Sequence, residues 1–349
     1  MSILLPRAVH IGNNILDDAA RIIDDLELEK NAVIVCDPVT RKIAADSLRD
    51  QLVEHGYEIS LYEISGANEG SISGTNRIIK EQNARFAIGV GGGRSIDVAK
   101  YTAFSNGIPF ISVPTAASHD GIVSGRASIH QGGRAKSMEA RTPIALIADT
   151  GVIARSPFRL LSAGYGDVIS NYSAVKDWEL SHRLTNEHFS TYAAVLAKMS
   201  AELLIRDAEF IKEGLEESAW KVVKALVGGG VAMAIAGSSR PASGAEHMFS
   251  HTLDHILDKP ALHGEQCALG SIIMMYLHGE DWRFTRDAMK KIGLGTTAAE
   301  LGIPDDMIVK AIVDAPKIRP ERYTILGPGI SEDAARNAAT ITGVIGNYY

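Results

Sequence analysis

The first half of the chain alternates short apolar runs with longer stretches in which apolar residues recur at helical spacing. Four apolar runs predict strands, at 32–36, 58–64, 86–90 and 110–113. Helical periodicity predicts helices over 40–55 and 74–83, and a hairpin over 127–136 turns at Gly132 and Gly133. Strands that alternate with helices are typical of βαβ units, so we expect a parallel sheet of the nucleotide-binding type.

The pattern changes at about residue 155, after which helical periodicity dominates. Helices are predicted to open at 164–171 and to cover 172–183, 188–210 and 215–236. We therefore expect two domains, an α/β nucleotide-binding domain over 1–155 and an all-α domain over 156–349. The most membrane-like run, 225–239, is short and rich in glycine, which favours a buried helix.

Histidines recur within the helical half at intervals that suit a metal site. Ser243 and Glu246 have the spacing of a capping box and predict a helix start. His247, His251 and His255 follow at intervals of four residues, about one turn apart on one helix face. After a break at 258–260, a second apolar segment opens with His263.

This spacing leaves two interpretations open, a metal site or histidines that are satisfied core and surface residues. A catalytic zinc takes three protein ligands and keeps one position open, so two histidines here need a third ligand. Asp167 is a candidate carboxylate, although it is also explained as an early-turn residue stabilised by the helix dipole. Cys267, four residues past His263, is either near the metal or a small buried core residue, and the second interpretation is favoured.

Glycines follow a predicted strand at 91–93 and precede a helix. Consecutive glycines allow a phosphate to approach the backbone and the helix N-terminus, although a plain turn is the alternative. The motif differs from G-x-G-x-x-G, which argues against an ordinary Rossmann dehydrogenase. The next strand ends in a polar loop at 114–121, and both strand ends are expected to line one crevice. Asp37 is either a ribose ligand or a turn residue before Pro38.

Composition narrows the class of protein further. The 349 residues are 22% charged with a net charge of −7, which argues against nucleic acid as the main partner. Two cysteines suit a reducing cytoplasm, and the N-terminus shows no signal-peptide pattern. We expect a cytoplasmic protein without membrane insertion.

Six motifs together resemble the sn-glycerol-1-phosphate dehydrogenases, archaeal enzymes related to glycerol dehydrogenase and the iron-containing alcohol dehydrogenases. They are GGGRSIDVAK (91–100), VPTAASHDGIVSGRAS (113–128), GYGDVISN (164–171), SSRPASGAEHMFSH (238–251), LHGEQCALG (262–270) and IRPERYTIL (318–326). The resemblance covers most of the chain and implies the dehydroquinate synthase-like fold of iron-containing alcohol dehydrogenases. It also implies reversible reduction of dihydroxyacetone phosphate to sn-glycerol 1-phosphate, the backbone of archaeal membrane lipids, with zinc and NAD(H) or NADP(H).

The resemblance also assigns roles to residues. The implied metal ligands are Asp167, His247 and His263, and these with His251 form the catalytic set. Asp120, Asp167 and His251 are implied to contact the substrate. The implied cofactor contacts are Gly93, Arg94, Ser95, Ile96, Asp97, Thr115, Ala116, Ala117, Ser118 and Ser124. His255 receives no role and is expected to be structural.

Other hypotheses rest on charge, position or general chemistry. His251 is a candidate to bind a substrate hydroxyl or to relay a proton. Arg240, Arg319 and Arg322 are candidate partners of a substrate phosphate. The rival functions are a glycerol dehydrogenase acting on an unphosphorylated polyol, a 3-dehydroquinate synthase-like lyase and a non-catalytic sensor. A homo-oligomer is expected, and the preference between NAD and NADP stays open.

Overall fold

The computed structural model describes residues 3–132 and 134–346. The chain divides into two compact units, Met1–Leu161 with Glu213–Val227, and Ser162–Lys212 with Gly228–Tyr349. The domain boundary near residue 155 stays a prediction from hydrophobic periodicity. Each unit is described by itself below.

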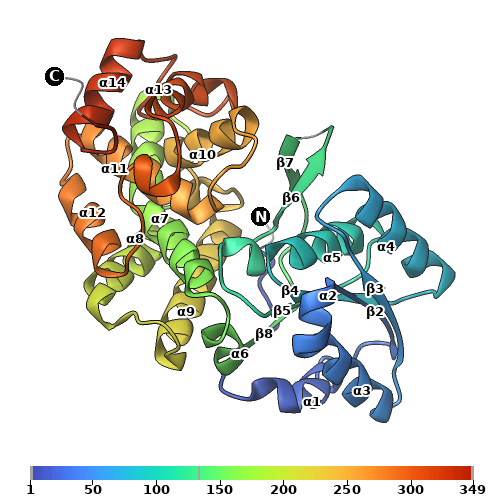
Figure 1. The fold of residues 1–349 in the computed structure, drawn as a ribbon. Coiled ribbons are helices and arrows are strands. Elements are labelled where there is room, and N and C mark those ends of the chain that lie inside the picture. Colours follow the sequence, from blue (N-terminus) through green and yellow to red (C-terminus); the bar gives the residue numbers. More distant parts are fainter. Residues whose placement is uncertain (1–2, 133, 347–349) are drawn as a thin grey trace. The chain divides into compact units, whose positions relative to one another are not determined.

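A six-stranded parallel sheet forms the centre of the first unit, in the order β1-β8-β5-β4-β2-β3 (Figure 1). Its strands are β1 (Ala8–Gly12), β2 (Asn31–Cys36), β3 (Glu58–Glu63), β4 (Phe86–Gly91), β5 (Phe110–Pro114) and β8 (Ala145–Asp149). The four predicted strands are confirmed as β2 to β5. The parallel sheet is therefore confirmed, while β1 and β8 were not predicted.

Helices cover both faces of this sheet. They are α1 (Ala19–Asp24), α2 (Pro38–Thr40), a π-helical turn (Arg41–Ala45), α3 (Asp46–Glu54), α4 (Glu69–Glu81), α5 (Gly93–Ser105) and α6 (Thr150–Ala154). Alternate residues of β2 face opposite sides: Ile34 packs in a cluster with Leu48 of α3, and Val33 packs in a cluster with Ile79 of α4. Such two-sided burial explains why these strands read as continuous apolar runs.

The predicted hairpin is confirmed as β6 (Arg126–Gln131) and β7 (Arg134–Glu139), which pair antiparallel. Gly132 has a φ of 59° in the connecting turn, a conformation that favours glycine. Gly133, the second predicted turn residue, lies outside the described residues.

Helices make up the described part of the second unit. They are α7 (Phe158–Thr185, from Ser162 on), α8 (Thr191–Arg206), α9 (Glu216–Ala236, from Gly228 on), α10 (Ala245–Ile256), α11 (His263–Leu277), α12 (Trp282–Lys291), α13 (Asp305–Asp314) and α14 (Glu332–Ile341). The prediction of one helix opening at 164–171 and another over 172–183 is wrong, because α7 is one helix of 28 residues. A Cβ on Gly166 would collide with the backbone oxygen of Gly264, so this glycine permits close helix packing rather than a flexible start.

The apolar run at 225–239 lies largely within α9, a helix of 21 residues. This helix is long and apolar enough to cross a membrane, by length and composition alone. However, 56% of its most apolar window is buried inside the protein, and core helices of soluble proteins have the same composition. The observation fits the predicted buried helix.

Candidate active site

The strand order of the first unit places two loops at one point of the sheet. From β2 the chain proceeds outward to β3, whereas from β4 it proceeds through β5 to β8 in the other direction. Parallel sheets bind ligands outside the carboxyl ends of the strands at such a reversal. The loops after β4 and β5 adjoin here, as expected, because the Thr115 N–H donates to the Gly91 carbonyl at 3.0 Å.

Two glycines at the junction of β4 and α5, Gly91 and Gly93, leave no room for a side chain. Gly91 has a φ of 149°, and a Cβ there would press on Ser95. A Cβ on Gly93 would overlap the imidazole of His119, which packs over the loop from the end of β5. The following helix, α5, has Gly92 as its N-cap and no side chain that caps it. Its first N–H groups are therefore a suitable binding site for an anion.

The predicted cofactor residues lie in these two loops, but with different surroundings. Arg94 is exposed, Gly93 and Ser118 are half-buried, and the remainder of the set is buried. The buried hydroxyls of Ser95 and Ser124 have no hydrogen-bond partner among the described residues. Buried hydroxyls normally find a partner, so these two are available to a bound ligand.

Asp97 and Asp37, by contrast, are engaged with the protein itself. Asp97 pairs with the fully buried ammonium of Lys100 at 3.1 Å and accepts from the Ser128 N–H at 3.0 Å. Lys100 also donates to the carbonyls of Gly121 and Arg126. The Asp37 side chain caps α2 by accepting from two backbone N–H groups, which supports its interpretation as a turn residue. Asp120 is half-buried in a 3-10 turn after β5.

In the second unit, the start of α10 differs from the predicted capping box. The prediction that Ser243 is the N-cap is wrong. The N-cap of α10 is Gly244, which has no side chain to accept from the first N–H groups of the helix. Instead the Glu246 carboxylate accepts from the Gly244 N–H at 2.6 Å. The helix does carry His247, His251 and His255, as predicted, and His263 is the first residue of α11.

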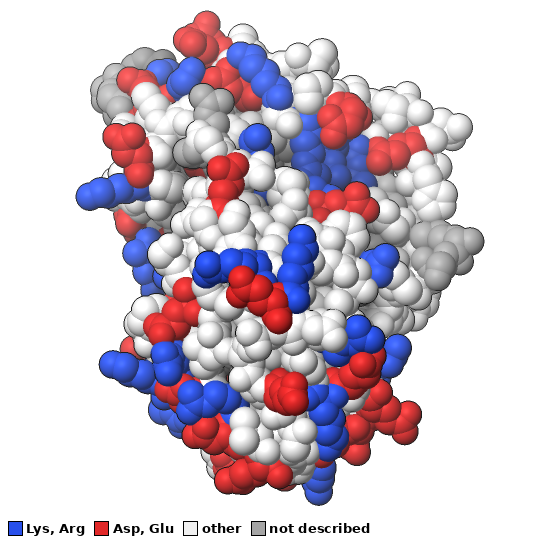
Figure 2. All heavy atoms as spheres, turned by 90° about the vertical axis from the view of Figure 1, so that its right-hand side faces the viewer, with Lys and Arg blue, Asp and Glu red and all other residues white. Residues whose placement is uncertain are grey.

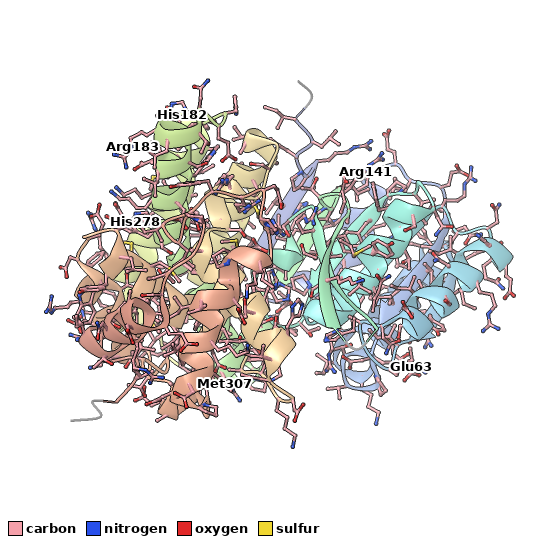
Figure 3. The ribbon with its side chains drawn as sticks, turned by 90° about the horizontal axis from the view of Figure 1, so that it is seen from above. Glu63, Arg141, His182, Arg183, His278 and Met307 are labelled. Atoms are coloured by element: carbon pink, nitrogen blue, oxygen red, sulfur yellow. The ribbon has the colours of Figure 1, made fainter. Side chains whose placement is uncertain are left out.

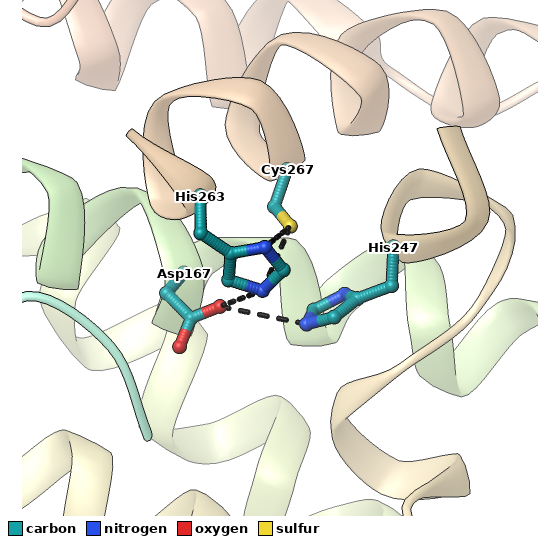
Figure 4. A group of neighbouring side chains, drawn as sticks. All are labelled: Asp167, His247, His263 and Cys267. Carbon is teal, nitrogen blue, oxygen red and sulfur yellow. Dashed lines mark hydrogen bonds and ion pairs between the residues drawn. The ribbon is translucent and has the colours of Figure 1, made fainter. Parts of the chain in front are cut away.

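The three predicted metal ligands lie close together (Figure 4). Asp167 comes from the long helix α7, and its Oδ1 lies 3.5 Å from His247 Nε2 and 3.7 Å from His263 Nε2. Donors 2.0–2.1 Å from a tetrahedral ion are about 3.3 Å apart, so these spacings are close to those of a ligand set. One carboxylate and two imidazoles therefore fit a divalent metal ion, and the Cys267 Sγ lies within reach of the same point.

Each of these imidazoles has a partner for its other nitrogen. His247 Nδ1 lies 3.0 Å from the Glu246 carboxylate, and His263 Nδ1 lies 3.0 Å from the Ser250 hydroxyl. Both rings are thereby turned so that Nε2 faces Asp167. Metal-binding histidines in proteins show this arrangement almost always. Sequence reasoning missed Glu246 and Ser250 as partners, although Glu246 is the direct neighbour of His247.

The mutual charges of this cluster shift the pKa values of its members. Burial lowers the pKa of His263, but the nearby Cys267 thiolate and the Asp167 carboxylate outweigh it and raise the pKa to about 9. Burial also opposes the charged form of His247, yet the same two neighbours raise its pKa well above the usual value. Burial raises the pKa of Cys267, but the two imidazoles outweigh it and lower the pKa.

His251 lies beside this cluster in a different state. Its ring stacks on His263 with ring centres 5.6 Å apart, and its Nδ1 lies 3.7 Å from the Asp254 carboxylate. Burial, together with repulsion from the other two imidazoles, lowers the pKa of His251 to about 4. His251 is therefore neutral near pH 7. The i+3 spacing of Asp254 on the same helix was a signal that sequence reasoning missed. His255 is exposed.

The three candidate arginines gather near the start of α10. Arg240 is buried and forms an ion pair with Glu187, while its other nitrogen donates to the Tyr323 carbonyl. Arg322 donates to the Ser243 carbonyl at 2.6 Å, and burial with repulsion from Arg319 and Arg240 lowers its pKa to about 9. The charges of Glu187 and Glu246 partly offset those of the guanidinium groups at Arg322, but burial and the other two arginines outweigh them.

Comparison with known proteins agrees with these features. Residues 10–157 match the family model described as iron-containing alcohol dehydrogenase. A probable glycerol dehydrogenase from Sinorhizobium meliloti 1021 superposes with a TM-score of 0.79 at 24% identity, covering 98% of this chain and 97% of that one. The fold is therefore that of the iron-containing alcohol dehydrogenase class.

Relatives of higher identity define the family more narrowly. The chain is 53% identical to glycerol-1-phosphate dehydrogenase [NAD(P)+] of Methanococcoides burtonii, over 98% of this chain and 96% of the relative. It is 51% identical to the enzyme of the same name from Pyrococcus abyssi, over 97% of this chain and 98% of the relative. The chain belongs to the glycerol-1-phosphate dehydrogenase family.

Proposed function

We propose that this protein reversibly reduces dihydroxyacetone phosphate to sn-glycerol 1-phosphate, with NADH or NADPH as hydride donor and a zinc ion. The observation that carries the proposal is the convergence of Asp167 with His247 Nε2 and His263 Nε2, in a chain whose relatives bear this enzyme's name over nearly their full length. The ketone accepts a hydride from the cofactor and a proton from the protein or solvent, and NAD(P)+ leaves.

Asp167, His247 and His263 would hold the zinc, which supplies a Lewis acid for the substrate oxygen. His251 is neutral at pH 7, as its lowered pKa requires, so it is able to donate a hydrogen bond to a substrate hydroxyl or to pass on a proton. The adjacent Asp254 carboxylate orients its ring. Asp120 is proposed as a further substrate contact.

The cofactor is proposed to bind the two loops at the strand ends of the first unit. Its pyrophosphate would approach the N-terminus of α5 over Gly93. The hydroxyls of Ser95 and Ser124, which have no partner among the described residues, would hydrogen-bond to it. Asp97 supports the site from behind, because its carboxylate already holds Lys100 and β6. The remaining contacts are proposed for Arg94, Ile96, Thr115, Ala116, Ala117 and Ser118.

Arg319 and Arg322 are proposed to bind the substrate phosphate. Both donate to the Ser239 hydroxyl, at 3.4 and 3.0 Å, so their charges lie side by side near the start of α10. Arg240 is a weaker candidate, since its guanidinium is already paired with Glu187. Replacing Arg319 or Arg322 with Ala should raise KM for the phosphorylated ketone, while an unchanged KM removes that arginine from the site.

The direct test follows NAD(P)H oxidation by zinc-loaded protein with dihydroxyacetone phosphate and, separately, with dihydroxyacetone. Oxidation with the phosphorylated ketone, and sn-glycerol 1-phosphate as product, supports the proposal. Equal or faster oxidation with dihydroxyacetone would instead indicate a glycerol dehydrogenase. No oxidation with either ketone favours a lyase that recycles its cofactor, or a sensor.

The cellular setting is also proposed by analogy with the family. The product would supply the glycerophosphate backbone of archaeal lipids in the cytoplasm, and the protein would act as a homo-oligomer. Basic and acidic side chains are interspersed over the face shown in Figure 2, and the net charge is −7. Such a surface suits a small-molecule enzyme better than a nucleic-acid-binding protein.

A further inference from the structure

The carboxylate of Glu246 is fully buried beside the candidate metal ligands. Three other residues hydrogen-bond to it, and the charges of Asp177 and Arg322 also act on it. Its Oε1 accepts from the Gly244 N–H at 2.6 Å and lies 3.0 Å from His247 Nδ1, and its Oε2 accepts from the Ser173 hydroxyl at 3.0 Å. A buried carboxylate is costly unless it is paired, so this set of contacts fixes its position.

The contact with His247 decides which ring nitrogen carries the proton. An ionised carboxylate only accepts hydrogen bonds, so the proton lies on Nδ1. On binding a metal, the His247 imidazolium would lose its second proton from Nε2, the nitrogen that faces Asp167 at 3.5 Å, and the lone pair would then lie on Nε2. The same contact fixes the rotation of the ring, since Nδ1 and Nε2 are held from opposite sides.

We propose that Glu246 is a positioning residue of the metal site, which holds His247 as the Nδ1–H tautomer and directs its Nε2 lone pair at the ion. The inference rests on the metal site of the proposed function. Glu246 is not one of the proposed ligands and would act on the ion only through His247. Its partner differs from that of the second imidazole, because His263 Nδ1 meets a neutral Ser250 hydroxyl. The two histidine ligands are therefore supported unequally.

The surrounding network makes Glu246 rigid. Ser271 of α11 donates to Ser173 of α7, which in turn donates to Glu246, so three helices contribute to its position. A second buried carboxylate, Asp177 of α7, accepts from the Ala245 N–H and pairs with His278, the C-cap of α11, which Figure 3 labels. Asp177 thus holds the same helix start through the Ala245 N–H, and no hydrogen bond joins it to His247 among the described residues. Its charge also acts on Glu246, so Asp177→Asn is a control for the helix start and for the loss of a nearby buried charge.

Glu246 also accepts a backbone N–H at the start of α10, so a purely structural role as a helix cap is the alternative. Glu246→Gln separates the charge of Glu246 from its role as a cap. The amide oxygen can still accept from the Gly244 N–H and from His247 Nδ1, as Oε1 does in the wild type, whereas the negative charge opposite His247 Nδ1 is lost. A cap alone therefore predicts no change in metal affinity.

The first measurement is zinc affinity of the full-length protein by competition with a chelator. Glu246→Gln should weaken zinc binding about 10- to 100-fold, the usual effect of losing such a partner. The control Asp177→Asn should stay within about threefold of wild type. Unchanged affinity in Glu246→Gln, or an equal loss in both variants, would overturn the proposal.

A second measurement needs no variant to fold. NMR of ¹⁵N-histidine-labelled, zinc-loaded wild type should show His247 with its proton on Nδ1 and the metal on Nε2. Coordination through Nδ1 would overturn the proposal. If the wild type binds no zinc, the proposed function fails as well, whereas normal zinc binding with unchanged affinity in Glu246→Gln removes only the role of Glu246.

Discussion

The two units present their proposed ligand sites by different means. In the first unit, the loop after β4 offers backbone N–H groups at the start of α5, and side chains such as Asp97 support it from behind. In the second unit, side chains from three helices converge, and the backbone only holds them in place. A backbone site depends on glycine and close packing, whereas a side-chain site depends on protonation and on the partners of each ligand.

The largest expected effect comes from removing a metal ligand. His247→Ala should lower the rate of ketone reduction by about 1000-fold or more, because a Lewis acid contributes several kcal/mol to such a reaction. NAD(P)H affinity, measured by cofactor fluorescence, should be unchanged. A large loss of cofactor affinity would show that the two sites are not separable as described.

The corresponding change in the first unit is Asp97→Ala. It leaves the fully buried Lys100 ammonium without its carboxylate, which should destabilise the protein by about 3 kcal/mol or more. Urea unfolding measures this free energy. Zinc affinity of the folded fraction should not change, and a stability equal to wild type would contradict the structural role of the ion pair.

Zinc affinity should also depend on pH. His263 is protonated in the metal-free protein below its pKa of about 9, and it must lose that proton to bind a metal. Apparent affinity should therefore fall as the pH is lowered from 9, by about tenfold per unit for each proton released. Calorimetry in buffers of different ionisation enthalpy counts those protons. A pH-independent affinity between 9 and 7 would contradict the raised pKa.

A smaller effect is expected for Gly93→Ala. The new methyl group would displace His119 and with it the loop after β5, so NAD(P)H affinity should fall about tenfold. Gly12→Ala is a matched control, because a Cβ at this other strand end makes only an ordinary contact with Ile15. Fluorescence titration measures the NAD(P)H affinity of both variants. Equal affinities of Gly93→Ala and Gly12→Ala would contradict the claim that position 93 requires glycine.

The smallest effect is expected for Ser243→Ala. The Ser243 side chain does not cap α10, so the free energy of unfolding should change by less than about 0.5 kcal/mol. A loss near 1 kcal/mol in thermal or urea unfolding, typical of a lost N-cap, would restore the capping box predicted from the sequence.

Much of the first unit was predictable from the sequence. A strand that is buried on both faces consists of an unbroken run of apolar residues, as in β2 and β4. The fully buried β8 has the same signal in Ala145–Asp149 and is as long as β5, so it was equally predictable from the sequence. The long helix α7 was divided in two, because Gly164 and Gly166 read as a helix start until the packing against Gly264 is known.

Part of the candidate metal site was also predictable from a local pattern, the helical spacing of its histidines. Helical spacing brought His247 and His251 to one helix, and it placed His263 just after the following break. Asp167 was one candidate carboxylate, and the family resemblance selected Asp167, His247 and His263 as the ligand set. The role of Glu246 depends on Ser173, which is 73 residues distant in the chain. Local patterns carry no information about such a contact, so the capping rule assigned Glu246 to Ser243 instead.

X-ray absorption at the zinc edge of the zinc-loaded wild type tests the central claim most directly, namely that Asp167, His247 and His263 hold the ion and leave one position open. The account predicts a first shell of nitrogen and oxygen only, with the scattering pattern of two imidazoles. A sulfur atom at about 2.3 Å would contradict it, because Cys267 would then close the position that the substrate oxygen requires.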